Sequence, residues 1–183
     1  MQTPTHQRLG AAVLAAVVAS AGCNVDVRGD GPGRKGNVDI RTPIGSLSVR
    51  SDGTAPDTGL PTYPDARPLG DDGEPGSADV NLDTSWFGVK VAAARFESDD
   101  AQQKIIDFYR QELQAYGEVT ECRGNVDFKG SRGARRPVCK ESRFSREIQL
   151  AAGSEGRQRV VAVKPRGDGS EFALIYVQMR ARD

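Results

Sequence analysis

The chain has 183 residues, 25 Lys and Arg against 25 Asp and Glu, and one histidine, His6. This length is enough for one domain. Because no histidine follows His6, a Ser-His-Asp or Cys-His catalytic centre is excluded from the rest of the chain, and a zinc site there would need cysteine and carboxylate ligands alone.

The amino terminus is typical of an export signal. Residues 9–21 are uncharged and mostly apolar, follow Arg8, and are fewer than the roughly 20 apolar residues of a membrane-spanning helix. Ser20-Ala21-Gly22-Cys23 resembles the lipobox of bacterial lipoproteins, with serine where leucine is usual. We therefore predict a lipoprotein signal peptide over residues 1–22 and lipidation of Cys23.

This interpretation places the protein in the bacterial cell envelope, exported and anchored in a membrane. Asn24, directly after the cysteine, favours the outer membrane if the host has one, by resemblance to lipoprotein sorting in such bacteria. The alternative is an ordinary cleavage site, Ala19-Ser20-Ala21, which would release a soluble protein that begins at Gly22.

The two remaining cysteines predict a disulfide. If Cys23 carries lipid, Cys122 and Cys139 are left as a natural pair in an oxidising compartment. The bond would stabilise the fold by about 3 kcal/mol on the chain-entropy model. Two buried free thiols are the alternative.

Composition divides the rest of the chain. Residues 24–83 contain ten glycines and seven prolines, and every aromatic residue lies at Tyr63 or later. We therefore predict a flexible tether over residues 23–59 and a globular domain over residues 60–183. Within the tether, apolar and polar residues alternate on each side of a turn over residues 37–50, which gives a weak hairpin signal. The alternative is a piece of linker that becomes ordered on contact, because two strands alone are only marginally stable in water.

The globular part shows strands and one helix. Residues 69–84 look like a loop rich in Asp and Gly. The helix is predicted over residues 100–116, where apolar residues recur every three or four positions before Gly117. Strand patterns cover residues 88–96, 118–123, 143–151, 159–164 and 172–177. These elements predict an α+β fold, a mostly antiparallel sheet of about five strands covered by one amphipathic helix.

Three segments carry a resemblance to a known group of proteins. They are Leu60-Pro61-Thr62-Tyr63-Pro64-Asp65-Ala66, the helix run Phe108 to Leu113 with Tyr116-Gly117, and the closing hairpin. Together they resemble uncharacterised bacterial envelope lipoproteins with a Tyr-Pro-Gly-Ala element and a Phe-Tyr-x-x-x-Leu helix, and Asp65 replaces the glycine. The resemblance covers residues 60–180 and implies a small exported α+β domain without any assigned catalytic residue.

Basic residues gather between the two paired cysteines. Lys129, Arg132, Arg135 and Arg136 are our candidate contact for anionic head groups or for another envelope protein. A solvated loop is the alternative. Because no aromatic residues alternate with these cations, we expect no nucleic-acid partner.

The sequence thus predicts a lipid-anchored envelope protein that is a non-enzymatic binding or structural module. We expect no catalytic residue, no cofactor and no metal, and the sequence leaves the oligomeric state open. The alternative is a soluble secreted or periplasmic domain that binds a small ligand, with Tyr63, Trp86 and Tyr109 as the candidate pocket.

Overall fold

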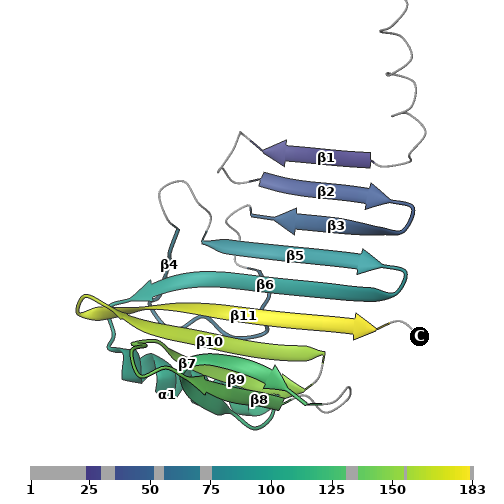
Figure 1. The fold of residues 1–183 in the computed structure, drawn as a ribbon. Coiled ribbons are helices and arrows are strands. Elements are labelled where there is room, and N and C mark those ends of the chain that lie inside the picture. The colour runs from purple at the N-terminus through teal and green to yellow at the C-terminus, as the bar shows by residue number, and fades with distance from the viewer. Residues whose placement is uncertain are drawn as a thin grey trace, which may run out of the picture.

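A computed structural model describes residues 24–29, 36–51, 56–70, 76–130, 136–154 and 156–181. They form one antiparallel sheet of eleven strands in the order β1-β2-β3-β5-β6-β11-β10-β9-β7-β8, with β4 beside β6 (Figure 1). The strands are β1 (Asn24–Gly29), β2 (Gly36–Thr42), β3 (Gly45–Arg50), β4 (Arg67–Pro68), β5 (Ser77–Thr84), β6 (Phe87–Ser98), β7 (Thr120–Lys129), β8 (Arg136–Glu141), β9 (Ile148–Ser154), β10 (Arg157–Arg166) and β11 (Gly169–Ala181). Helix α1 (Gln102–Leu113) continues into the 3-10 turn η2 (Gln114–Tyr116).

The prediction of about five strands covered by one helix is wrong. Strand β5 forms where we expected a loop, β8 forms inside the basic segment, and β1 lies in the expected tether. Strands β2 and β3 form the hairpin for which residues 37–50 give a signal, and β3 joins it to the sheet through β5. Apart from β8, these strands alternate small aliphatic with polar residues and stand among glycines and aspartates, so their composition resembles that of a linker. They add a second, helix-free half to the sheet (Figure 1).

Helix α1 packs on the other half. It buries Ile105, Ile106, Tyr109 and Leu113 against β9 and β10, in the half of the sheet that is built from the later strands of the chain. The same core contains aromatic and aliphatic side chains of the central strands, among them Ala94, Phe96, Leu150, Val161, Val163, Phe172 and Leu174. The helix predicted over residues 100–116 is therefore present, but it covers only part of one sheet face.

Strands β6 and β11 join the two halves. They pair over their whole length, from Ser98 with Ser170 to Phe87 with Ala181. One end of each strand contributes to the core under α1, and the other end extends into the helix-free half. The predicted closing hairpin is present as β10 and β11.

The predicted disulfide is confirmed. Cys122 and Cys139 are bonded, with their Cα atoms 5.4 Å apart, and they link β7 to β8. Strand β7 pairs with β9 up to Arg123 and with β8 from Gly124 onward. Gly124 has a φ of 111°, and a Cβ atom there would lie 2.9 Å from the Lys140 carbonyl oxygen, so this bend requires glycine.

Candidate functional site

The helix-free half of the sheet has one apolar face, which we call the valine face. It comprises Val38, Ile40, Leu47, Val49, Ala78, Val80, Leu82, Val89, Val91, Ala93, Ile175 and Val177. Directly paired residues of an antiparallel sheet point to the same side. The register joins Val38, Val49, Val80, Val91 and Val177 into one row across β2, β3, β5, β6 and β11.

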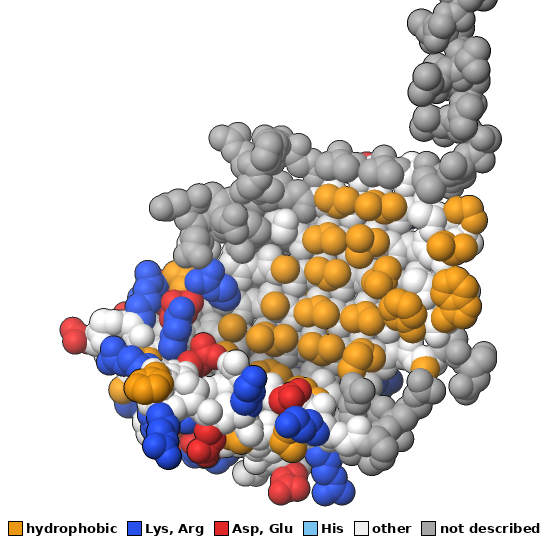
Figure 2. Space-filling model, viewed as in Figure 1, with side chains coloured by type: hydrophobic (Ala, Val, Ile, Leu, Met, Phe, Trp, Pro, Cys, Tyr) orange, Lys and Arg blue, Asp and Glu red, His pale blue; other side chains and the backbone are white. Residues whose placement is uncertain are grey.

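The valine face lies open at the surface. All twelve of its residues are half-buried and none is fully buried, although they are surrounded by apolar neighbours. Figure 2 shows their side chains as uncovered rows. Because Ala92, Ala94 and Phe96 alternate with Val91 and Ala93 along β6, the core under α1 lies on the opposite side of the sheet.

The reverse side of the same strands is polar. Asp39, Ser48, Asn81 and Lys90 form one row across β2, β3, β5 and β6. Lys90 also pairs with Asp79 at 3.8 Å. This half of the molecule is therefore a single amphipathic layer, in which the polar side suits water and the valine face does not.

One end of this half carries large exposed apolar side chains. Ile44 is 62% exposed in the β2–β3 turn, Trp86 63% and Phe87 43% at the β5–β6 turn, and Met179 39% near the end of β11. They are four of the five large hydrophobic side chains that are exposed in the described residues. We call this group of four the turn end.

The turns at this end are ordered by hydrogen bonds. The Ser85 N–H donates to the Ile44 carbonyl at 3.3 Å, which holds the two turns side by side. The Thr84 hydroxyl accepts from the N–H groups of Trp86 at 3.3 Å and Phe87 at 3.0 Å. Asn24 pairs with Arg41, so β1 begins at the same end of the sheet (Figure 1).

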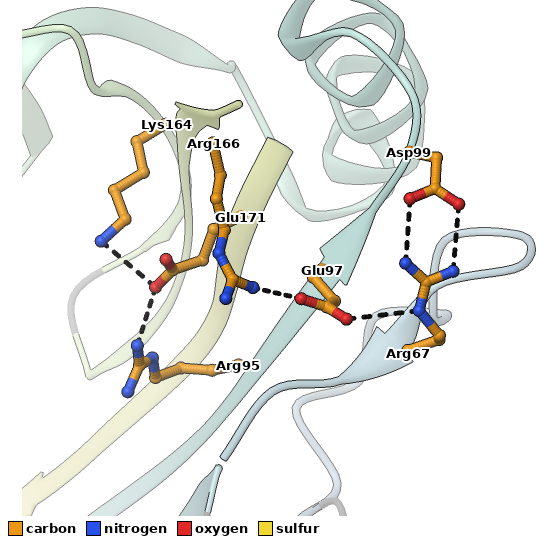
Figure 3. Close-up of polar contacts among 7 residues, drawn as sticks. All are labelled: Arg67, Arg95, Glu97, Asp99, Lys164, Arg166 and Glu171. Atoms are coloured by element: carbon orange, nitrogen blue, oxygen red, sulfur yellow. Dashed lines mark hydrogen bonds and ion pairs between the residues drawn. The ribbon is translucent and has the colours of Figure 1, made fainter. Parts of the chain in front are cut away.

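A second candidate surface lies at the far end of β6, and its charges are paired internally. Arg67 donates to Asp99 at 2.9 Å and to Glu97 at 3.3 Å, and Arg166 also contacts Glu97 (Figure 3). Hydrogen bonds from Arg67 hold the pKa of the Asp99 carboxyl below its usual range. These residues line a cavity of about 250 Å³.

Glu171 lies beside this cluster. Its carboxylate accepts a hydrogen bond from Arg95 at 2.8 Å and pairs with Lys164 at 3.2 Å (Figure 3). Burial raises the pKa of Glu171, but the hydrogen bonds from Arg95 and Lys164 outweigh burial and lower it. The carboxylates of Glu97, Asp99 and Glu171 are thus already engaged, which suits a structural role better than ligand binding.

The residues we predicted as sites are only partly described. Cys23, Arg132 and Arg135 lie outside the described residues. Lys129 ends β7 and Arg136 begins β8; both are exposed, and they pair in register.

The predicted aromatic pocket is not formed. Tyr63 and Tyr109 are buried, and their hydroxyl groups donate to Asp100 at 2.8 Å and to the Pro61 carbonyl at 3.1 Å. Trp86 is exposed in the β5–β6 turn, in the helix-free half. These three side chains therefore do not line one site.

Sequence reasoning missed the valine face. Its signal is the alternation of Ala78, Val80 and Leu82 with Asp79, Asn81 and Asp83, which is a strand pattern. We assigned it to a loop because of the glycines and aspartates before it.

Within the described ranges, we find no group of three or more His, Cys, Asp or Glu residues placed to hold a metal ion. No helix in the same ranges is long and apolar enough to cross a membrane. Comparisons with protein families, with curated proteins and with solved structures find no match for this chain.

Proposed function

We propose that this chain is a lipid-anchored protein of the bacterial cell envelope, held through Cys23, whose sheet is a non-enzymatic binding module that pairs with a second copy of the chain. The observation that supports the binding role is the open valine face. Continuous apolar patches on a monomer usually mark interaction sites.

The size of the face suits a small interface. Five strands about 4.8 Å apart and about 3.3 Å per residue give roughly 400 Å² in projection on each copy. Because side chains make the real surface larger than its flat projection, two such faces bury about 1,000 Å² in total. This is the lower limit for a specific protein interface. Such a dimer is weak in solution, and anchoring both copies in one membrane strengthens it by raising their effective concentration.

The shape and charge of the face favour a second copy as the occupant. All twelve of its side chains are uncharged, so two copies meet without repulsion on this surface. Two sheets pack face to face about 10 Å apart with their strands within about 30° of each other. A two-fold axis parallel to the strands brings the valine faces together and keeps both turn ends pointing the same way, as two copies anchored in one membrane require.

The position of Cys23 supports the anchored state. It directly precedes Asn24, the first residue of β1, so at most a few bonds separate a lipid there from the sheet. The confirmed disulfide also suits an oxidising compartment. Contact of Lys129, Arg132, Arg135 and Arg136 with anionic head groups stays a prediction.

The anchor is tested by intact-protein mass spectrometry on material from the native host. We expect a chain that begins at Cys23 and carries added acyl mass. A chain that begins at Gly22 without lipid would contradict the anchor and support a soluble exported protein.

Self-association is tested by sedimentation velocity on the mature chain with Cys23→Ser, which removes the lipid. We expect a reversible dimer with a dissociation constant of about 10 µM, in the range of small interfaces. A single-copy species at about 1 mM would contradict the second copy. Lipid that co-purifies with such a monomer would mean that the valine face binds acyl chains instead of a second copy.

A further inference from the structure

The turn end presents large apolar side chains outside the core, and the proposed dimer covers only two of them. Met179 pairs with Val89, and Phe87 lies two residues before Val89, so both continue the valine face. Ile44 and Trp86 lie in turns beyond the strands, whereas the dimer contact runs along the strands of the valine face. Phe87 and Met179 lie next to them, at the start of β6 and near the end of β11. A second sheet on the valine face would leave Ile44 and Trp86 exposed in their turns, so these two side chains are free for another partner.

We propose that the turn end dips into the interfacial layer of the lipid bilayer, so that the sheet stands on the membrane with its strands pointing away from it. The inference rests on the proposed anchor at Cys23, since β1 begins with Asn24 at this same end (Figure 1). A lipid at Cys23 would hold these turns at the membrane surface.

The side chains suit that layer. Tryptophan is enriched at membrane–water interfaces because its ring is largely apolar and its N–H remains hydrated, and phenylalanine and isoleucine partition into the adjoining acyl region. Two exposed arginines, Arg41 and Arg180, lie within one or two residues of the same end, where they can meet lipid phosphates.

The backbone of the turns is also compatible with partial burial. The N–H groups of Ser85, Trp86 and Phe87 are all hydrogen-bonded, to the Ile44 carbonyl or to the Thr84 hydroxyl. The Thr42 hydroxyl donates to the Gly45 carbonyl at 2.9 Å in the neighbouring turn. Moving these groups out of water therefore leaves those donors paired, which removes the main cost of inserting irregular backbone.

The test uses Trp86, the only tryptophan in the sequence. The lipidated mature chain is reconstituted in vesicles of phosphatidylethanolamine and phosphatidylglycerol. We expect Trp86 emission at a shorter wavelength than in water, quenching by lipids brominated near the carbonyl end of their acyl chains, and protection from aqueous iodide. Emission that stays at the aqueous wavelength, with full iodide quenching, would overturn the inference.

Matched variants separate insertion from non-specific adhesion. In the unlipidated Cys23→Ser chain, Ile44→Ser with Phe87→Ser is expected to lower vesicle partitioning by at least about tenfold, because two apolar side chains are lost. Phe144→Ser is the control, since Phe144 is 97% exposed in the loop between β8 and β9. Equal effects of the two changes would overturn the inference.

These results distinguish a failure of the membrane contact from a failure of the anchor. If the chain is acylated but Trp86 remains in water, the lipid anchor is supported and the membrane contact of the turn end is rejected. If the chain has no acyl mass but brominated lipid quenches Trp86, the anchor is rejected and the membrane contact of the turn end is supported.

Discussion

Val80→Glu is expected to convert the dimer into a monomer, with a dissociation constant at least about a hundredfold higher. Val80 lies in the middle of the valine face, in β5, between Val49 and Val91. Face-to-face packing would bury one new carboxylate on each copy without a partner, and an unpaired buried charge costs several kcal/mol. Sedimentation velocity over a concentration series measures the change.

Asn81→Glu is the matched control, because Asn81 follows Val80 in the same strand and lies in the row of the polar side. Its glutamate would face water in both monomer and dimer. We expect both variants to unfold within a few degrees of the unchanged chain, since Val80 is only partly buried in a single copy. Equal dissociation constants for the two variants would place the contact elsewhere.

The sequence was sufficient where local pattern and burial agree. The apolar stripe within residues 100–116 predicts α1, and its members Ile105, Tyr109 and Leu113 are buried at four-residue spacing. The alternation on each side of residues 165–170 likewise predicts β10 and β11. The disulfide followed from the number of cysteines and the expected compartment, and needed no knowledge of the fold.

The valine face could not be predicted in the same way. Its strands belong to a single layer, and the aspartates and serines of the polar side make β2, β3 and β5 look like a linker in composition. A half-sheet without a helix also contradicts the usual expectation that two layers enclose a core. Local alternation indicates the separate strands, but only their register shows that Val38, Val80 and Val177 lie in one row of one face.

Removal of the disulfide is expected to lower the free energy of unfolding by about 3 kcal/mol, which follows from a closed loop of this length. The cysteines are 17 residues apart. Cys122→Ala with Cys139→Ala is the suitable change, because Cys122 is buried and alanine adds no polar atom there. Denaturant titration measures the difference. Reductant should lower the free energy of unfolding of the unchanged chain by the same amount and leave that of the double variant unchanged.

The place of the bond in the sheet predicts which part responds first. Beyond Gly124, β7 pairs only with β8, and β8 is the last strand of the sheet. Without the bond, we expect amides of β7 after Gly124 and of β8 to lose more protection from hydrogen exchange than those of β6 and β11, which lose only the global difference in the free energy of unfolding. Equal loss across the sheet would mean that the bond does not restrict local opening of β7 and β8. Because the valine face lies on the retained strands, the reduced protein should still form the proposed dimer.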